Sequence, residues 1–508
     1  MIHPIKIKSA LISVYHKNNL EPLVRQLHKL GVALYSTGGT EKFIHDLGID
    51  VISIEALSGY PSILGGRVKT LHPKVFGGIL TRRENGADQT QITEYEIPEI
   101  DLVIVDLYPF EETVRSGASA NYCIEKIDIG GISLIRAAAK NYRDVVIIAT
   151  KDDYQTLETI LTQNNGQTDI VHRKKFAQKA FHVSSHYDTA IFNYFNQTDP
   201  LPVFKHSEQL VSELRYGENP HQKGHFYGNL NELFDQLNGK ELSYNNLVDI
   251  EAAIALIDEF NEPTFALLKH TNACGLASRE NLLQAWKDAL ACDPISAFGG
   301  VLICNREVDE KTAIEIDKIF FEVLIAPFFA KEAVHKLSSK KNRILLKRKN
   351  IALPTKQFKS LLNGIIEQDK DLKIELPNHL KTVTDRKPNK EELKDLSFAN
   401  KIVKHTKSNA IVLIKDATLL ASGIGQTSRV DALRQAIAKA EALDFDLQGG
   451  IMASDAFFPF ADCIKLAADA GIALVIQPGG SIKDQESIDI ANQKGMGMVT
   501  TGIRHFKH

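Results

Sequence analysis

A lysine and a histidine stand side by side at the end of a predicted β-strand. Lys269 and His270 follow the apolar run 265–268 and precede the turn-like residues 271–275. An imidazole has an unperturbed pKa of about 6.5, so it can accept and return a proton near neutral pH, and a neighbouring ammonium can stabilise an oxyanion. The pair therefore suits group transfer to a weak nucleophile. The plainer alternative is two unrelated polar residues at a strand terminus.

Two glycine-rich segments near the N-terminus indicate a phosphate site. The first is the strand-to-helix turn made of Ser36, Thr37, Gly38, Gly39 and Thr40. Backbone N–H groups converge at such a turn, and the following helix N-terminus carries partial positive charge. The second segment, 65–73, adds the cations Arg67 and Lys69 and the hydroxyl of Thr70. Together they favour a phosphorylated ligand, although a glycine turn can also merely close a strand–helix unit.

Three further residues could supply chemistry to the same region. Tyr108 follows an apolar strand, where its phenol could donate to an oxyanion or simply pack as an aromatic. Asp128 precedes a glycine pair and a helix, which suits a helix cap or a general base. Lys140 lies on the alanine-rich helix that follows. A lysine apposed to Asp128 would polarise a substrate carbonyl, whereas the alternative is a solvated basic stripe.

The composition bounds the class of protein. The chain has 508 residues, 44% hydrophobic and 24% charged, with a net charge of -3, so we expect several globular domains and no chain-wide attraction for nucleic acid. The basic segment 336–349 is either a solvated face or a site for polyanions. Five cysteines show no C-x-x-C spacing, which predicts a reducing, cytoplasmic location without a zinc cluster. We expect no signal peptide and no membrane span.

The pattern of apolar residues predicts an α/β protein. Strands are predicted at 9–14, 32–35, 102–105 and 145–149, and helices at 20–30, before Gly48 and around 133–141. This alternation is typical of a parallel sheet. The polar stretch 196–202 predicts a boundary between domains 1–199 and 200–508, and a weaker break at 367–392 divides the second domain. No internal repeat is visible in the letters, so two related subdomains remain a hypothesis.

A series of short motifs runs in order to the last residue of the chain. They are GRVKTLHP (66–73), LYPF (107–110), IDIGG (127–131), AAAKN (137–141), LRYGENPHQ (214–222), LSYNNLVDIEAA (242–253), LKHTN (268–272), DPISAFGG (293–300), GIGQTSRVDA (423–432), SDAFFPF (454–460), QPGGSIKDQE (477–486) and TGIRHFKH (501–508). With these motifs the chain resembles the bifunctional purine-biosynthesis family that joins AICAR transformylase to IMP cyclohydrolase.

The resemblance implies a fold and two consecutive reactions. Residues 1–199 would form a methylglyoxal-synthase-like parallel-sheet domain with IMP cyclohydrolase activity. Residues 200–508 would form a transformylase of two cytidine-deaminase-like subdomains. The co-substrate 10-formyltetrahydrofolate would give its formyl group to the 5-amino group of AICAR, and formyl-AICAR would then close its ring with loss of water to give IMP. A homodimer that acts on small molecules, without a catalytic metal, is also implied.

The resemblance assigns residues to formyl transfer. His270 would be the base that deprotonates the AICAR amine, assisted by Lys269, and Asn409 would orient the formyl oxygen. The remaining positions would contact the nucleotide or folate: Arg215, Tyr216, Phe457, Asp462, Arg504 and His508. Phe457 would stack on the aminoimidazole. Chain ends usually fray, so the assignment of His508 requires a docked C-terminus.

Ring closure would depend on a second set of residues. The resemblance implies Lys69, Tyr108, Asp128 and Lys140 as catalytic residues, with Ser36, Gly38, Gly39, Thr40, Arg67 and Thr70 holding the nucleotide. Two positions depart from the family pattern. An expected asparagine before LYPF is Asp106 here, and the expected S-V-S-D-K-T is the segment 13–18, with Tyr15 and His16 in place of Ser and Asp. Both departures put ligand contacts in doubt, including that of Lys17.

Two rival functions predict different observations. A zinc nucleobase deaminase needs H-x-E and P-C-x-x-C ligands, and P-C-x-x-C is absent from the sequence. A phosphate-sensing module without catalysis would need the glycine turns but not the set Lys69, Tyr108, Asp128 and Lys140. Both rivals are therefore disfavoured.

Overall fold

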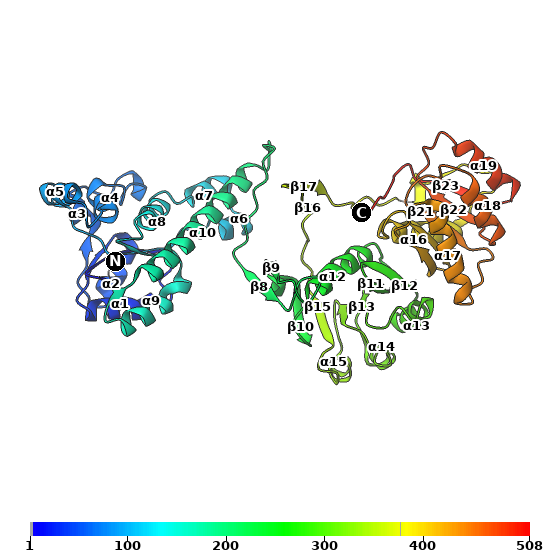
Figure 1. Ribbon diagram of the computed structural model, residues 1–508, viewed down its shortest axis with the longest axis horizontal. Helices are drawn as coiled ribbons and strands as arrows, with labels where there is room; N and C mark the ends of the chain where they lie inside the picture. Colours follow the sequence, from blue (N-terminus) through cyan, green and yellow to red (C-terminus); the bar gives the residue numbers. More distant parts are fainter. Residues whose placement is uncertain (1–3, 376) are drawn as a thin grey trace. The chain divides into compact units, whose positions relative to one another are not determined.

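The chain folds into two compact units, and the division between them falls between Gln209 and Leu210 (Figure 1). The computed structural model describes residues 4–375 and 377–508. The predicted boundary after residue 199 lies in the irregular segment that follows the long helix α10 (Ile170–Phe195). We call residues up to 209 unit 1 and the remainder unit 2, and describe each by itself.

Unit 1 is built on a five-stranded parallel sheet with the order β4-β3-β2-β5-β6. The strands are β2 (Ser9–Ser13), β3 (Ala33–Ser36), β4 (Ile52–Ser53), β5 (Leu102–Val105) and β6 (Val146–Ile148). Strands β5 and β6 are buried throughout, as parallel strands covered on both faces require. The predicted parallel sheet of an α/β domain is confirmed, and the predicted strands lie within one or two residues of their observed bounds.

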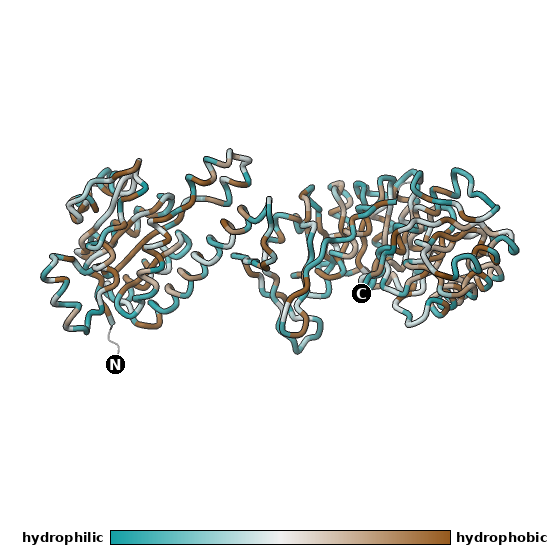
Figure 2. The backbone as a smooth tube through the Cα atoms, turned by 90° about the horizontal axis from the view of Figure 1, so that it is seen from above, coloured by the Kyte–Doolittle hydropathy of each residue, from teal (hydrophilic) through white to brown (hydrophobic). Residues whose placement is uncertain are grey.

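Unit 1 also contains helices, some of which pack on its sheet. They are α1 (Leu20–Lys29), α2 (Gly38–Asp46), α3 (Ile54–Ser58), α4 (Pro73–Leu80), α5 (Gly86–Glu94), α6 (Phe110–Arg115), α7 (Ala120–Glu125), α8 (Gly130–Lys140), α9 (Tyr154–Gln163) and α10. Helix α1 buries Leu20, Leu23, Val24 and Leu27 on one face, because residues three and four apart share a face of a helix. Helix α8 packs on β5 and β6, and α10 packs on α8. Figure 2 colours the backbone by hydropathy and shows hydrophobic stretches in brown running through the interior of unit 1.

Unit 2 contains a twelve-stranded mixed sheet in which the same topology occurs twice. Read from each outer edge of the sheet toward its middle, the first half has the order β10-β15-β14-β13-β11-β12 and the second half has the order β18-β23-β22-β21-β19-β20. In each half the sheet begins with an antiparallel pair, continues with two parallel pairs, and ends with two antiparallel pairs. The halves join where Ala277 of β12 pairs with Thr418 of β20. The hypothesis of two related subdomains therefore gains a topological basis.

The elements of the two halves correspond one to one. The first half consists of β10 (Phe234–Asn238), α12 (Tyr244–Ile257), β11 (Thr264–Lys269), β12 (Asn272–Ser278), α13 (Leu282–Cys292), β13 (Val301–Cys304), α14 (Glu310–Ile316), β14 (Val323–Ala326), α15 (Lys331–Leu337) and β15 (Ile344–Arg348). The second half consists of β18 (Lys381–Thr382), α16 (Lys390–Lys404), β19 (Ile411–Lys415), β20 (Thr418–Gly423), α17 (Arg429–Ala442), β21 (Ile451–Ser454), α18 (Asp462–Asp469), β22 (Leu474–Gln477), α19 (Asp484–Gln493) and β23 (Gly497–Thr500).

Packing repeats along with topology. Alternate residues of β11 enter two different cores: Ala266 and Leu268 face α12, whereas Phe265 and Leu267 face α13. Strand β19 alternates in the same way, since Val412 and Ile414 share the core of Ala266 and Leu268, while Ile411 and Leu413 enter a third core. One face of the sheet is therefore covered by α12 and α16 over a shared core. The other face has a separate core in each half, as a period of two residues along a strand requires.

Two exposed hairpins lie outside the repeats. Strands β8 (Val211–Leu214) and β9 (Gly224–Tyr227) precede the first half, and β16 (Lys356–Leu361) and β17 (Gly364–Asp369) connect the halves. The predicted break at 367–392 begins within β17 and ends at the start of α16. It therefore overlaps the C-terminal part of the connection between the two halves and the first elements of the second half.

Candidate active sites

The strand order of unit 1 locates its ligand site at the carboxyl edge of the sheet. The chain passes from β2 to β3 and β4 on one side and reaches β5 on the other side of β2, so the order reverses between β2 and β5. Ligands of open α/β sheets bind at this reversal, beyond the carboxyl ends of the strands. The segments that leave β2, β3 and β5 there are 14–17, 37–40 and 106–108. All three contain residues that the sequence singled out.

Lys69 lies against both predicted glycine clusters. Gly38 has a left-handed backbone with φ 57°, and a Cβ atom there would lie 3.1 Å from Nζ of Lys69. A Cβ atom on Gly66 would lie 2.8 Å from Cε of the same lysine. Thr70 is buried, and its Oγ1 would lie 3.0 Å from a Cβ on Gly130, at the start of α8. The glycines thus allow the backbone to approach an ammonium group, which is what a phosphate site needs.

Asp128 has a carboxylate surrounded by backbone donors. The N–H group of Gly131 donates to Asp128 Oδ1 at 2.6 Å, and the N–H group of Tyr108 also donates to this carboxylate. The Asp128 N–H group donates to the hydroxyl of Tyr187 at 2.9 Å. Burial raises the pKa of Asp128 above its ordinary value, although the N–H donors oppose this change. The geometry fits both sequence interpretations, a cap of α8 and a general base.

Tyr108 is exposed rather than packed in the core. Its ring meets the ring of Tyr15 edge-on, with 5.5 Å between centroids. The Lys126 ammonium lies 5.5 Å from the Tyr108 ring, 5.2 Å from the Tyr15 ring and 5.1 Å from the Tyr122 ring. A cation near aromatic faces is held by the ring quadrupoles. Lys126, which the sequence did not single out, therefore puts a fixed positive charge beside the Tyr108 phenol.

The two departures from the family pattern contact each other. The Asp106 carboxylate accepts hydrogen bonds from the N–H groups of Tyr15 and His16, and the ring Nδ1 of His16 lies 2.9 Å from Asp106 Oδ2. The resemblance led us to expect an aspartate at position 16 and an asparagine at position 106. In this chain Asp106 supplies the carboxylate at the junction, from the end of β5 rather than from the segment that follows β2.

Lys17 points into the same region. Its ammonium donates to the carbonyls of Val14 and Tyr15, and a Cβ atom on Gly39 would lie 3.9 Å from its Nζ. Burial lowers the pKa of Lys17, while the nearby carboxylate of Asp106 acts in the opposite direction. Lys17 thus remains beside the glycine turn despite the changed neighbours.

Other predicted nucleotide contacts are engaged by the protein itself. The Ser36 hydroxyl donates to the carbonyl of Ile12 at 2.7 Å, and the Thr40 hydroxyl donates to the carbonyl of Val14 at 2.9 Å. Both side chains are buried and tie the turn to β2. The Arg67 guanidinium is exposed and pairs with Glu125.

Lys140 is separated from Asp128 by the length of a helix. It is the last residue of α8, ten residues after Gly130, so the helical rise places it about 15 Å along the axis from the helix start. The structure therefore does not bring Lys140 beside Asp128, as the sequence interpretation required. Its predicted part in ring closure stays a prediction.

In unit 2, His270 occupies a tight turn between β11 and β12. His270 and Thr271 both have left-handed backbones, with φ 51° and 65°. Asp249 of α12 accepts the N–H group of Thr271 at 2.7 Å. The Lys269 ammonium donates to the carbonyl of Phe298 at 2.8 Å, so it is held on the DPISAFGG segment. The side chain of His270 is exposed and directed by a turn rather than by a strand.

A hydrogen-bonded asparagine joins the histidine turn to the segment that carries Asn409. Asn272 donates from Nδ2 to the carbonyl of His270 at 2.8 Å, and its Oδ1 accepts the N–H group of Lys407 at 2.9 Å. Residues 407–409 therefore lie beside the turn, although they are far from it in sequence. The structure thus brings two of the predicted catalytic segments, 269–270 and 407–409, together.

The side chain of Asn409 is fixed by Arg429. The Arg429 guanidinium donates to Asn409 Oδ1 at 2.8 Å, and Asn409 Nδ2 donates to the carbonyl of Gln426 at 2.9 Å. Arg429 is buried and also contacts Asp455 and the hydroxyl of Ser454. An amide nitrogen carries two hydrogens, so the orientation set by Arg429 leaves a second N–H for a ligand oxygen.

The C-terminus is docked against the same segment. The Ser408 N–H group donates to the carbonyl of Lys507 at 2.9 Å, and the Lys507 N–H group donates to Ser408 Oγ at 3.0 Å. The N–H group of His505 donates to the carbonyl of Asp455 at 3.0 Å. The condition for placing His508 near the active site is therefore met.

His505 clamps the C-terminal segment through its side chain. It is 2% exposed, with Nδ1 2.6 Å from Asp371 and Nε2 3.1 Å from Glu375. Burial acts to lower the pKa of His505, but the two carboxylates outweigh it and raise the pKa to about 9. An imidazolium between two carboxylates therefore secures the end of the chain at neutral pH.

The remaining predicted ligand contacts are partly gathered. Phe457 follows β21 and is half-exposed, and Asp462 begins α18, where it accepts the N–H group of Cys463. The Arg504 guanidinium lies 4.4 Å from the ring of Phe506 in the docked tail. Arg215 and Tyr216 stack on each other beyond β8 at 4.8 Å. Among the described residues, no hydrogen bond links Arg215 or Tyr216 to the histidine turn.

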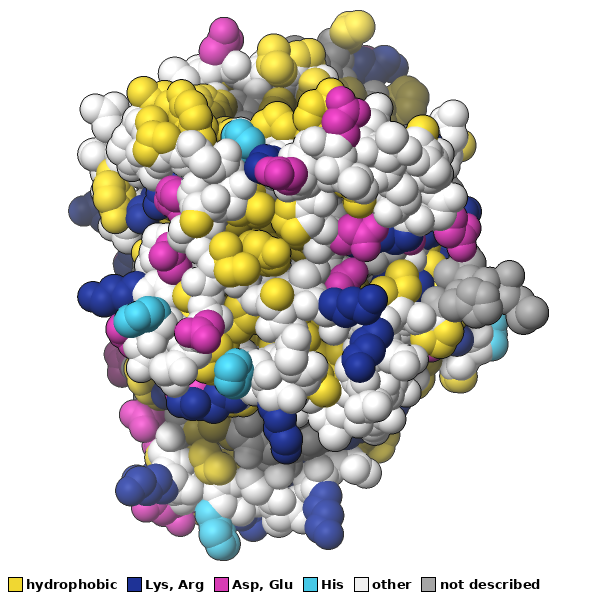
Figure 3. Space-filling model, turned by 90° about the vertical axis from the view of Figure 1, so that its left-hand side faces the viewer, with side chains coloured by type: hydrophobic (Ala, Val, Ile, Leu, Met, Phe, Trp, Pro, Cys, Tyr) yellow, Lys and Arg dark blue, Asp and Glu magenta, His cyan; other side chains and the backbone are white. Residues whose placement is uncertain are grey.

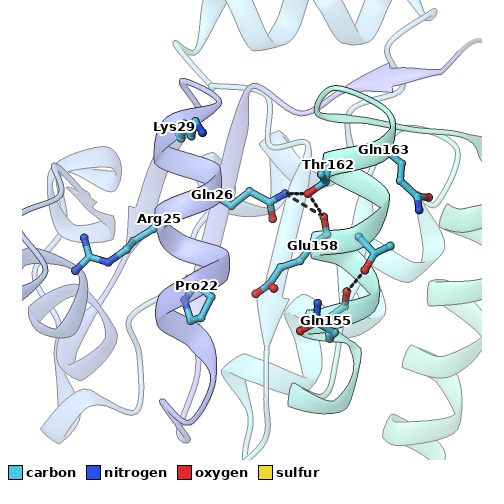
Figure 4. Close-up of a pocket in the computed structure, with 9 residues that line it drawn as sticks. Pro22, Arg25, Gln26, Lys29, Gln155, Glu158, Thr162 and Gln163 are labelled. Carbon is cyan, nitrogen blue, oxygen red and sulfur yellow. Dashed lines mark hydrogen bonds between the residues drawn. The ribbon is translucent and has the colours of Figure 1, made fainter.

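One surface groove of unit 1 lies away from these residues. A groove of about 520 Å³ lies between α1 and α9 and is lined by Arg25, Gln26 and Glu158 among others (Figure 4). Gln26 donates across it to the carbonyl of Glu158 and the hydroxyl of Thr162. The groove contains none of the predicted site residues. Backbone geometry and contacts, rather than groove size, locate the candidate chemistry.

Four of the seven basic residues in the segment 336–349 form ion pairs. Lys336 and Arg343 pair with Asp317, Arg348 pairs with Asp258, and Lys349 pairs with Asp235. This pairing favours a structural or solvated surface over a site for polyanions. On the face of unit 1 shown in Figure 3, basic and acidic side chains are also interspersed.

Within residues 4–375 and 377–508, no group of three or more His, Cys, Asp or Glu side chains is arranged to hold a metal ion. No helix there is both long and apolar enough to cross a membrane.

Comparisons with known proteins assign the family. A model described as "AICARFT/IMPCHase bienzyme" matches residues 138–439, and a model of the "MGS-like domain" matches residues 19–133. A protein of Bacteroides thetaiotaomicron named "Bifunctional purine biosynthesis protein PurH" is 61% identical over 99% of both chains. The chain belongs to the AICARFT/IMPCHase bienzyme family. It is therefore an AICAR formyltransferase and IMP cyclohydrolase of purine biosynthesis, and the family resemblance is confirmed.

Relatives of lower sequence identity also align with this chain over almost its full length. Proteins of the same name from Acetivibrio thermocellus and Rhodospirillum rubrum are 47% and 46% identical, over 99% and 100% of this chain and 100% of each relative. A solved structure, "Crystal structure of ForH", aligns with 37% of this chain and 99% of that one, at 37% identity and a TM-score of 0.33. The family implies 10-formyltetrahydrofolate as the co-substrate.

Several residues at the two sites escaped the sequence reasoning. Asp249 and Arg429 lie within motifs that the sequence singled out, LSYNNLVDIEAA and GIGQTSRVDA, but neither residue received a role there. Asn272 lies in LKHTN. Asp249, Asn272 and Arg429 each form a hydrogen bond with a residue far away in the sequence. Their position inside a motif was therefore the one signal that the sequence offered. Lys126 lies just before IDIGG, and nothing in the sequence indicated its position among tyrosines.

Proposed function

We propose that unit 2 performs formyl transfer and unit 1 performs ring closure. The observation that carries the first assignment is the hydrogen-bonded link from the His270 turn through Asn272 to the segment 407–409 and on to the docked tail. The second assignment is supported by two contacts: Lys69 lies beside Gly38 of the glycine turn, and the Tyr108 N–H group at the end of β5 donates to Asp128. The domain limits 1–199 and 200–508 and the cytidine-deaminase-like nature of both halves belong to this proposal.

His270 is the base of the formyl transfer. The AICAR amine is a weak nucleophile because its lone pair is delocalised into the ring, so it must lose a proton as it attacks the formyl carbon. His270 takes this proton, the bond between the formyl carbon and N10 of the folate breaks, and N10 receives a proton. Lys269, next to His270, assists proton movement.

Asn409 directs the formyl oxygen during this step. Its Oδ1 is occupied by Arg429, so the amide presents N–H toward the developing oxyanion, which a fixed donor stabilises. Phe457 stacks on the aminoimidazole, and Arg215, Tyr216, Asp462, Arg504 and His508 hold nucleotide or folate. The docked tail supports the inclusion of His508.

Ring closure needs orientation and charge stabilisation. The carboxamide nitrogen of formyl-AICAR attacks the formyl carbon, a C–N bond forms, and water leaves. Asp128 accepts a proton from the carboxamide, while Lys69 and Tyr108 stabilise the oxygen that leaves as water. The backbone N–H groups of Gly38 and Gly39 hold the phosphate, with Lys17, Arg67 and Thr70 nearby. Lys140 is retained on the family resemblance alone.

We infer further that the bienzyme works as a cytoplasmic homodimer and that neither reaction uses a metal. The dimer follows from the family resemblance, and transformylase groups would be shared across its interface. The ordinary donor sets of both sites, carboxylate, imidazole, amide and ammonium, are sufficient for proton transfer and acyl transfer.

A variant of His270 tests the assignment of formyl transfer. The whole protein with His270→Ala should lose at least about 100-fold in kcat for formyl-AICAR formation, because a general base typically contributes that much or more. The same preparation should still convert supplied formyl-AICAR to IMP at the rate of the unmodified protein. Formation of formyl-AICAR at an undiminished rate by this variant would refute the assignment.

A further inference from the structure

The two halves of unit 2 share a turn that ordinary residues rarely adopt. In the first half, His270 and Thr271 connect β11 to β12 with φ 51° and 65°. In the second half, Asp416 and Ala417 connect β19 to β20 with φ 51° and 48°. The left-handed region disfavours residues that carry a Cβ atom, and hairpin turns of this kind usually contain glycine or asparagine. Something outside each turn must therefore hold it.

An aspartate at the same place in each half caps its turn. Asp249 is the sixth residue of α12, and Asp395 is the sixth residue of α16. Asp249 Oδ1 accepts the N–H group of Thr271 at 2.7 Å. Asp395 accepts the N–H groups of Asp416 and Ala417, each at 3.1 Å. The second donor in each turn is the equivalent residue, so the device has been retained in both halves.

A second contact of the turn is also repeated. Asn272, the first residue of β12, donates to the carbonyl of His270 at 2.8 Å. Thr418, the first residue of β20, donates to the carbonyl of Asp416 at 3.2 Å. Each turn is thus held on one side by a helix carboxylate and on the other by the first side chain of the returning strand.

The two turns differ in the side chain that they present. The first presents the imidazole of His270, whereas the second presents Asp416 followed by Ala417. Burial raises the pKa of Asp249 and of Asp395, and in both cases the N–H groups of the capped turn oppose this change. Both carboxylates are therefore partly buried, and their hydrogen bonds to the turn offset the cost of desolvation.

We propose that Asp249 is the positioning residue of the transformylase base. By accepting the N–H group of Thr271, Asp249 fixes the left-handed turn and thereby the direction in which the His270 imidazole leaves the sheet. This inference rests on the proposed role of His270. Asp249 does not touch the substrate; it acts through the backbone of the turn, and Asp395 does the same for a turn without a base.

The test compares variants that keep or remove the acceptor. Asp249→Ala removes the acceptor of the Thr271 N–H, and kcat for formyl transfer should fall about tenfold or more with KM for AICAR changed less than threefold. Asp249→Asn keeps an oxygen acceptor and should stay within about threefold of the unmodified kcat. The matched control is Asp395→Ala, which removes the same cap from the other half and should leave kcat within twofold.

The turn itself offers a rescue. Glycine adopts the left-handed conformation without strain, so Thr271→Gly combined with Asp249→Ala should recover most of the lost kcat. This double variant also serves if Asp249→Ala alone does not fold. Unchanged kcat in Asp249→Ala, an equal loss in Asp395→Ala, or a loss that the glycine does not recover would each overturn the inference.

His270→Ala, assayed in parallel, separates this inference from the proposed function. If His270→Ala retains formyl transfer, the proposed base is wrong and the positioning role falls with it. If His270→Ala loses formyl transfer while Asp249→Ala keeps it, the positioning role alone is wrong.

Discussion

Asp128 shows how burial and backbone donors tune a single carboxyl group. Burial raises its pKa above the ordinary value, against the effect of N–H donors that include Gly131 and Tyr108. A raised pKa makes the carboxylate a stronger base than an exposed aspartate. It also means that the protonated, inactive form persists to higher pH. Protonation of Asp128 should therefore limit the rate of ring closure at low pH.

The pH dependence of ring closure should report this carboxyl group. The proposed role requires the carboxylate, so kcat/KM for formyl-AICAR should fall as pH falls through the raised pKa. The acid limb should lie above the ordinary aspartate value of about 3.9. Asp128→Asn should lower kcat of ring closure about 100-fold or more while formyl transfer is unchanged. An acid limb at or below the ordinary value, measured on the unmodified protein, would contradict this.

Sequence patterns identified reacting groups better than the groups that orient them. His270, Lys69 and Asp128 could be proposed from residue type and position in the sequence, whereas Asn409 was proposed from the family resemblance alone. Arg429 could not be proposed, because its effect depends on a buried hydrogen bond to Asn409, twenty residues away, in a fold that brings α17 beside that segment. A motif shows that such a residue belongs to the family pattern, but it does not show which residue its side chain contacts.

Elements determine whether a predicted pair of residues can meet. Lys140 and Asp128 lie at opposite ends of α8, and a helix rises about 1.5 Å per residue, so no side-chain rotation alone makes them neighbours. The alternation of strands and helices in unit 1 could be predicted from apolar periodicity. The hydrogen bonds between the 407–409 segment, the His270 turn and the tail could not, because they join elements distant in sequence.

The docking of the C-terminal segment should depend on the protonation of His505. Its pKa is about 9 in the folded protein and ordinarily 6.5, so the stabilisation is present below pH 6.5 and is lost as pH rises toward and through about 9. His505→Ala should lower the free energy of unfolding by about 2 kcal/mol at pH 6.5, and by much less at pH 10. Urea unfolding at both pH values measures this.

The matched control for this clamp is His508→Ala, three residues further along the chain. His508 is exposed, so its removal should change the free energy of unfolding by about 0.5 kcal/mol or less at either pH. A pH-independent effect of His505→Ala, or an equal effect of both variants, would show that His505 does not act as a charged clamp.

At the scale of the whole molecule, unit 2 is a repeated half joined through β12 and β20, and unit 1 is a separate parallel-sheet unit. The repeat could not be detected in the amino-acid sequence, because the two halves share a strand order and a pattern of alternating burial. Many different apolar residues can produce the same pattern of burial. The family motifs lie within both units. We therefore propose that the two reactions take place at two independent sites, one formed by unit 1 and one formed by unit 2 of the dimer, with formyl-AICAR passing between them.

Mixing two single variants tests this account most directly. Given AICAR and 10-formyltetrahydrofolate, Lys69→Ala alone should accumulate formyl-AICAR, and His270→Ala alone should leave AICAR unconverted. An equimolar mixture of the two variants should restore IMP formation, because each supplies the site that the other lacks. A mixture that forms no more IMP than either variant alone would contradict the central claim of two independent sites.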